Sequence, residues 1–202
     1  MNLKSRPNGR RTNTSVKKTG KKVALFAMTM FTALSLNSCR IIIDNTGFLY
    51  LQEEEKKKVV PCRDAIENLP NDGRIYLVTK EQLQQYLDSR DKVLIYEYIF
   101  FCRSEHCVNP AIVEKACKER NIDFCLMARS YGSILFNLPE MRMPILSINP
   151  EPYDKSIYKQ CSEKFFNELT NTTFKTRGYG GYFLFEKGEY KGCFDEFMDA
   201  LK

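Results

Sequence analysis

The sequence contains a single histidine, His106, among 202 residues. One imidazole leaves little from which to build a Ser-His-Asp or Cys-His catalytic arrangement. The chain also lacks a glycine-rich phosphate loop, a nucleophile elbow and a second cysteine or histidine pair at metal-ligand spacing. These absences leave the eight cysteines as the residues best placed to carry chemistry.

Acidic side chains are missing from residues 1–39, which hold eight of the 31 Lys and Arg residues. The rest of the chain therefore carries 23 basic and 25 acidic side chains. The formal charge of +6 belongs to the N-terminal segment, so it does not indicate nucleic-acid binding by the remainder. No nucleic-acid partner and no cofactor are expected.

The apolar run Val23–Leu36 is too short to cross a bilayer comfortably as a permanent helix. It follows a basic segment that ends at Lys22, and this order is typical of a secretory signal peptide over residues 1–38. The run ends in LNSC, which resembles the lipobox of bacterial lipoproteins, although Asn37 departs from its usual small residue. The resemblance implies lipidation at Cys39 and a cell-envelope location. An ordinary cleaved signal and an uncleaved anchor remain alternatives.

Residues 39–60 have the character of a tether between the anchor and a globular domain. Glu53–Glu55 precede Lys56–Lys58 by three and four positions, which favours ion pairs along a short helix. Pro61 prevents that helix from continuing. A charged docking patch is the alternative interpretation of this run.

Residues 61–202 have an α/β pattern, and a central strand carries the fold. Residues 92–101, KVLIYEYIFF, are almost continuously apolar and predict a strand covered on both faces. Thr79 and Gln82 form a capping box for the helix before it, while Asn109 and Pro110 begin the helix after it. Other strands are expected at 74–78 and 144–150, a helix at 153–169, and a last helix within 194–202.

The stretch FFCRSEHCVNP places Cys102 and Cys107 five positions apart at the end of the central strand. On a helix these positions lie about 8 to 9 Å apart, beyond the reach of a disulfide. The two cysteines can therefore pair only if residues 103–106 form a loop. Asn109 and Pro110 favour this loop because they start the helix after Cys107.

This order of strand, helix, strand, cysteine pair and helix resembles the first half of thioredoxin-fold proteins. In the second half, TRGYGGYFLFEKGEYKG at residues 176–192 resembles the thioredoxin segment that ends in a Gly-Glu hairpin turn. The resemblance implies a thioredoxin-like central mixed β-sheet flanked by helices. It places Gly180 where the family has a substrate-facing cis-proline, and an alternative threading gives that place to Pro144. Residues 121–143 have no counterpart and are interpreted as an insertion with its own strand.

The resemblance also implies an activity, thiol–disulfide exchange on envelope proteins by a membrane-anchored enzyme. Cys102 would be the attacking thiol, Cys107 the resolving thiol, and His106 or Arg103 would favour the thiolate. The alternative is a non-catalytic binding or export-accessory module with a structural disulfide. A metal site is not expected, because one short loop supplies three ligands at most.

Two further expectations concern residues near this pair. Glu97 lies one position away from the family's buried acid, whose place Tyr96 takes, so Glu97 is expected to be paired elsewhere or partly exposed. Cys117, Cys125 and Cys161 are expected to act as small buried hydrophobes.

Overall fold

The computed structural model describes residues 47–99, 102, 104–131, 143–153, 158–173, 175 and 181–202. These residues belong to one compact unit, Ile42–Lys202. The predicted signal peptide 1–38, the lipidation site Cys39, Arg103 and the candidate Gly180 lie outside the described residues. No helix within the described ranges has the length and apolar character needed to cross a bilayer.

A mixed sheet of seven strands forms the centre of the fold, in the order β1-β2-β5-β4-β3-β6-β7. Strands β1 to β5 pair in parallel. At one side of the sheet, β6 pairs antiparallel with β3, and β7 pairs antiparallel with β6. The strands span Val59–Pro61 (β1), Ile75–Val78 (β2), Lys92–Tyr98 (β3), Asp123–Ala128 (β4), Ile145–Ile148 (β5), Tyr182–Glu186 (β6) and Glu189–Phe194 (β7). The predicted α/β class, a central mixed sheet flanked by helices, is confirmed.

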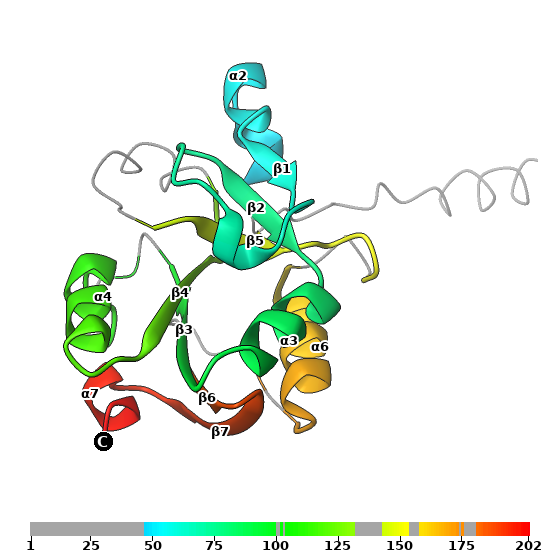
Figure 1. The fold of residues 1–202 in the computed structure, drawn as a ribbon. Helices are drawn as coiled ribbons and strands as arrows, with labels where there is room; N and C mark the ends of the chain where they lie inside the picture. Colours follow the sequence, from blue (N-terminus) through cyan, green and yellow to red (C-terminus); the bar gives the residue numbers. More distant parts are fainter. Residues whose placement is uncertain are drawn as a thin grey trace, which may run out of the picture. The chain divides into compact units, whose positions relative to one another are not determined.

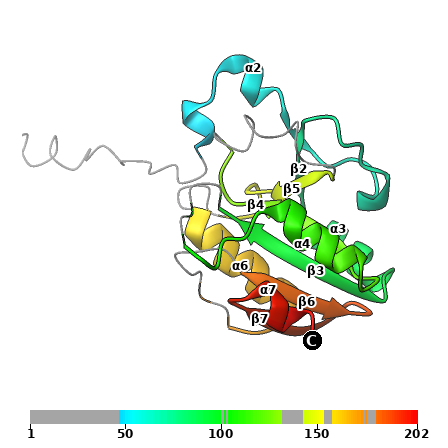
Figure 2. The ribbon, with the colours of Figure 1, turned by 90° about the vertical axis from the view of Figure 1, so that its left-hand side faces the viewer.

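Helices cover both faces of this sheet. Helices α4 (Pro110–Lys118) and α7 (Phe197–Ala200) lie on one side, and α3 (Lys80–Asp88) and α6 (Tyr158–Thr170) lie on the other (Figure 1, Figure 2). Each side has its own buried apolar cluster. Side chains of β3 alternate between the two clusters, because successive residues of a strand face opposite sides. The most apolar strand thus occupies an interior position, as its sequence predicts.

The helix starts form as the sequence predicts. Thr79 Oγ1 accepts a hydrogen bond from the Gln82 backbone at 3.3 Å, and Gln82 Oε1 accepts one from the Thr79 backbone at 2.9 Å. Asn109 Oδ1 accepts a hydrogen bond from the Ala111 backbone at 2.9 Å, and Pro110 is the first residue of α4. Helix α4 therefore begins three residues after Cys107, which leaves room for a loop between the two cysteines.

The segment before the sheet differs in part from a simple tether. Helix α2 (Glu53–Lys56) is a single turn with the expected i,i+3 ion pairs, and a 3-10 turn, η1 (Phe48–Tyr50), precedes it. Val59 and Val60, placed at the end of the tether by sequence, instead pair with β2 in the sheet. A second 3-10 turn, η2 (Ile66–Asn68), connects β1 to β2. The sheet thus begins two residues before the predicted domain boundary, because two valines supply a strand edge.

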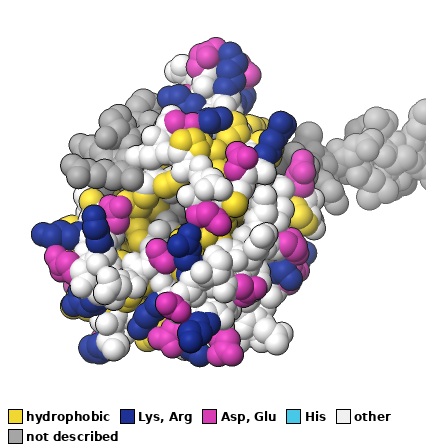
Figure 3. Space-filling model, in the orientation of Figure 1, with side chains coloured by type: hydrophobic (Ala, Val, Ile, Leu, Met, Phe, Trp, Pro, Cys, Tyr) yellow, Lys and Arg dark blue, Asp and Glu magenta, His cyan; other side chains and the backbone are white. Residues whose placement is uncertain are grey.

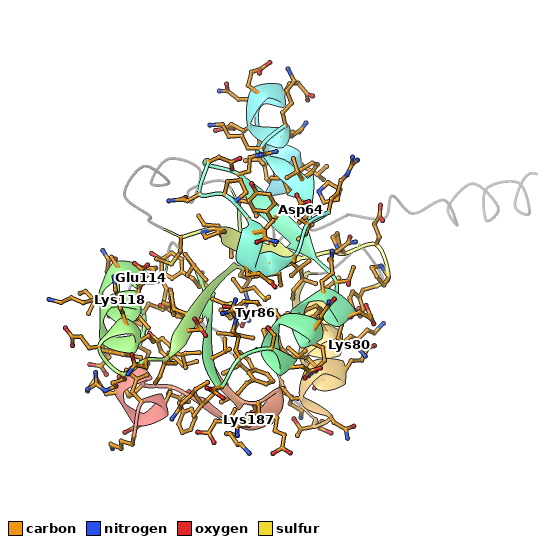
Figure 4. The ribbon with its side chains drawn as sticks, viewed as in Figure 1. Asp64, Lys80, Tyr86, Glu114, Lys118 and Lys187 are labelled. Carbon is orange, nitrogen blue, oxygen red and sulfur yellow. A yellow bond between two sulfur atoms is a disulfide. The ribbon has the colours of Figure 1, made fainter. Side chains whose placement is uncertain are left out.

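The region around residues 121–143 contains the expected additional strand. Strand β4 lies between β3 and β5, and β5 in turn separates β4 from β2. The β6–β7 hairpin turns through Lys187 and Gly188, which both have positive φ angles, of 50° and 79°. A Cβ atom at Gly188 would also collide with the Asp88 carboxylate at the end of α3, so glycine is required there. Lys187 is seen at this turn in Figure 4.

Candidate functional site

A disulfide joins Cys102 to Cys107 directly after β3, at its carboxyl end. The two Cα atoms lie 5.9 Å apart, and both side chains are half-buried. Residues 104–106 form a turn, in which the Cys107 backbone donates to the Ser104 carbonyl at 3.0 Å. The predicted non-helical loop is therefore present among its described residues, and it brings the two sulfur atoms together.

Two tyrosines from the sheet donate hydrogen bonds to this loop. The Tyr182 hydroxyl donates to the His106 carbonyl at 2.9 Å, and the Tyr96 hydroxyl donates to the Val108 carbonyl at 3.1 Å. Tyr96 comes from β3 and Tyr182 from the neighbouring strand β6, and the two residues are paired in register. The carbonyls that they bind stand on either side of Cys107.

The ring of His106 contacts a residue that follows the last strand of the sheet. Its Nδ1 atom lies 2.5 Å from Glu196 Oε1, in the short connection between β7 and α7. The His106 side chain is 28% exposed and the Glu196 side chain 48%, so the pair is open to solvent. The sequence led us to expect a thiol-tuning role for His106 but gave no sign of its contact with Glu196, which is 90 positions away.

No group of three or more His, Cys, Asp or Glu side chains among the described residues is arranged to hold a metal ion. Charged side chains of both signs are interspersed on the face shown in Figure 3. For example, Glu114 and Lys118 lie one turn apart on α4 (Figure 4). The described side chains on this face therefore form no large patch of one charge sign.

The five other cysteines that the structure describes remain thiols, and four of them are buried. Burial raises the pKa of Cys117 and of Cys125 to about 12, and it also raises the pKa of Cys62. Tyr86 points from α3 toward the sheet (Figure 4) and its hydroxyl interacts with the Cys125 thiol. Because the thiolate is the reactive form, these buried thiols are poor nucleophiles. The expected buried positions of Cys117, Cys125 and Cys161 are confirmed.

Pro144 does not lie beside the disulfide loop. It directly precedes β5, and β4 separates β5 from β3. No peptide bond among the described residues is cis, so Pro144 lacks the cis bond that the alternative threading implies. The first threading's candidate, Gly180, lies just before the described Gly181, whose carbonyl accepts a hydrogen bond from the Glu97 backbone at 2.9 Å.

Glu97 is buried, with 1% of its surface exposed, and it is paired on the α6 side of the sheet. Arg129 binds its two carboxylate oxygens at 3.2 and 3.0 Å, and Ser162 of α6 donates to Oε1 at 2.6 Å. The expectation of a partner elsewhere is confirmed, and the alternative of partial exposure is wrong. Arg129 and Ser162 were missed by sequence reasoning, although an arginine directly after the apolar strand β4 was a usable signal.

Comparison with known proteins adds little to this geometry. No protein-family model and no curated protein matches the sequence. A solved structure of human ERp44 in its zinc-bound form is similar over 63% of this chain, with 14% sequence identity and a TM-score of 0.26. The match covers 29% of the ERp44 chain, so the present chain spans less than a third of that protein. At this TM-score the match supports no functional conclusion.

Proposed function

We propose that this chain carries out thiol–disulfide exchange with protein substrates through Cys102 and Cys107. The observation that carries the proposal is the position of this disulfide. It is partly exposed near the carboxyl end of an interior strand, in a loop that precedes a helix, whereas four of the other five described cysteines are buried. Reactive cysteines are found in accessible positions of this kind, and buried cysteines are inert.

The exchange proceeds in two balanced steps. In the reducing direction the Cys102 thiolate attacks one sulfur of a substrate disulfide, which forms a mixed disulfide and releases the other substrate sulfur as a thiolate. The Cys107 thiolate then attacks Cys102, which releases the second substrate thiol and forms the Cys102–Cys107 bond. The substrate gains two electrons and the pair loses two. A dithiol substrate drives the same steps in reverse, so the direction depends on the potentials of the two pairs.

His106 is the sequence neighbour of the resolving cysteine. When it is protonated, its positive charge favours the thiolate of the adjacent Cys107. Glu196 fixes the ring at the 2.5 Å contact, so the charge stays in one place during the reaction. We therefore assign His106 a supporting role, with Cys102 and Cys107 as the catalytic residues.

A purely structural role explains this disulfide less well. Closing a loop of so few residues restricts the unfolded chain by only about 2 kcal/mol, which is at the low end for disulfides. The loop is also held by the Tyr96 and Tyr182 hydroxyls and by the Asn109 cap. A disulfide that adds little constraint to an already braced, half-exposed loop is better suited to being opened and closed.

The test is to trap the mixed disulfide. In a Cys107→Ser chain the resolving step is blocked, so we expect covalent complexes with envelope proteins, visible on non-reducing gels and removed by dithiothreitol. Cys102→Ser should abolish these complexes. Cys193→Ser in the Cys107→Ser background is the matched control, because Cys193 is also half-buried but is not part of the disulfide, and it should leave them unchanged.

The alternative, a binding module with a bracing disulfide, gives a different result. In that case neither single variant forms covalent complexes, both lower the melting temperature by similar amounts, and the noncovalent partners are unchanged. That outcome would rule out the exchange activity.

We further propose that the mature chain begins at a lipidated Cys39 and works at the membrane surface of the cell envelope. The support is the sequence of residues 1–39, a basic segment that ends at Lys22, a short apolar run and LNSC. Metabolic labelling with an alkyne fatty acid should modify the wild-type chain, and Cys39→Ala should abolish the label and release the protein from washed membranes. Cys193→Ala is the control and should keep the label. An unmodified mature chain that starts at Met1 would contradict the proposal.

A further inference from the structure

Two stacked tyrosines, Tyr96 and Tyr182, pack next to the disulfide loop and donate hydrogen bonds to it. Tyr96 and Tyr182 are both fully buried, and their rings stack with centroids 4.4 Å apart and planes inclined by 22°. The Tyr98 ring packs edge-on against Tyr96, and the Phe197 ring is tilted against Tyr182. Both contacts lie on the side of the sheet that α4 and α7 cover. A stacked aromatic pair of this kind fixes the position of each ring closely.

Both hydroxyls are directed at the backbone around Cys107. Tyr182 donates to the carbonyl one residue before Cys107, and Tyr96 donates to the carbonyl one residue after it. Within the loop, the Cys107 backbone donates to the Ser104 carbonyl, and the His106 backbone donates to the Ser104 hydroxyl at 3.3 Å. The two tyrosines add a hydrogen bond on each side of Cys107 and so hold its backbone in place.

These hydroxyls act as neutral donors. Burial raises the pKa of Tyr96 above the ordinary tyrosine value, and the adjacent Tyr182 hydroxyl adds to the increase. Burial likewise raises the pKa of Tyr182. Both groups thus keep their protons at any physiological pH. Removing one hydroxyl would leave a carbonyl of the loop without this donor.

We propose that Tyr96 and Tyr182 are positioning residues that set the reduction potential of the Cys102–Cys107 pair by stabilising its oxidised form. Reduction adds two electrons and two protons to the disulfide and yields two thiols, which no longer hold residues 102 and 107 together. The loop can then relax, and the two hydrogen bonds weaken. The coupling is reciprocal. Because the disulfide strengthens these hydrogen bonds, the hydrogen bonds in turn stabilise the disulfide against reduction. The inference rests on the proposed exchange function, because a potential matters only if the pair is opened and closed.

The experiment is a redox titration of the full chain in glutathione buffers, in which two glutathione thiols are oxidised for each disulfide reduced. The state of the pair is read by alkylation and peptide mass. Loss of one hydrogen bond in the oxidised form should raise the equilibrium constant for reduction about threefold to tenfold in Tyr182→Phe and in Tyr96→Phe. That corresponds to a potential about 15 to 30 mV less negative. Tyr76→Phe is the matched control, because Tyr76 is also a buried tyrosine but its hydroxyl donates to Asp72, at 2.9 Å and away from the loop, and it should leave the constant unchanged.

A second measurement keeps the inference testable if the variants are less stable. Urea unfolding of the oxidised and reduced chains closes the same thermodynamic cycle, and Tyr182→Phe should destabilise the oxidised chain more than the reduced one. Equal destabilisation with an unchanged redox constant would overturn the inference. If the redox constant shifts but no mixed disulfides are trapped in the Cys107→Ser chain, the positioning role stands and the exchange function falls.

Discussion

At the scale of single residues, Tyr96 and Glu97 show how one position decides a role. Adjacent residues of β3 face opposite sides of the sheet, so Tyr96 reaches the disulfide loop on the α4 side while Glu97 reaches Ser162 on the α6 side. The acid therefore cannot lie under the cysteines in the manner that the thioredoxin resemblance implies. A tyrosine donor takes the place of an acid, and the acid becomes part of a buried ion pair.

We expect the buried ion pair between Glu97 and Arg129 to contribute to the stability of the fold. Arg129→Met should lower the free energy of unfolding by about 3 to 5 kcal/mol, because it leaves the buried carboxylate with one partner fewer. Lys191→Met is the control, since it breaks an exposed pair in which the Glu189 side chain is 77% exposed, and it should change the free energy of unfolding little. Urea unfolding at neutral pH measures both. Similar small losses in the two variants would show that Arg129 does not compensate the Glu97 charge.

At the scale of elements, local signals in the sequence were sufficient to predict most helices and strands. The Thr79–Gln82 box, the Asn109 cap and the apolar run of β3 each act within a few residues, so each is visible without the fold. The disulfide loop was predictable for the same reason, because a helix cannot bring positions 102 and 107 together.

Long-range pairing was not predictable in the same way. Nothing in Ile145–Ile148 itself indicates that β5 lies between β2 and β4, since all three strands are short and apolar. The same limit hid the contacts of His106 with Glu196 and of Val108 with Tyr96, which depend on how the strands are ordered. The sequence thus indicated the pair that forms the disulfide, whereas the groups that hold its loop became visible only in the folded chain.

At the scale of the whole molecule, the described cysteines occupy two kinds of position, a partly exposed loop and the apolar clusters of the interior. The one disulfide among the described residues lies in a half-exposed loop, and Cys117 and Cys125 lie in separate apolar clusters on opposite faces of the sheet. Cys117 and Cys125 therefore lie on opposite sides of the sheet, and burial shields both thiols from solvent.

The buried thiols predict how global stability depends on pH. The pKa of Cys117 and of Cys125 is about 12 in the folded chain against 9.0 for an ordinary thiol. Above pH 9 the unfolded chain therefore loses protons that the folded chain keeps, so the free energy of unfolding should fall as the pH rises toward 12. The expected slope approaches about 1.4 kcal/mol per pH unit for each thiol, and buried tyrosines add to it above pH 10.

Urea unfolding of the oxidised chain between pH 8 and pH 10 measures this slope. Cys125→Ala should make the decline shallower, because one of the buried titrating thiols is gone, while at pH 7 both chains should be insensitive to pH from this source. The cavity left by the lost sulfur shifts stability at every pH equally, so only the slope reports the thiol. A decline that is as steep in Cys125→Ala as in the wild-type chain would mean that Cys125 titrates normally in the folded state, and its burial would then not protect it from oxidation.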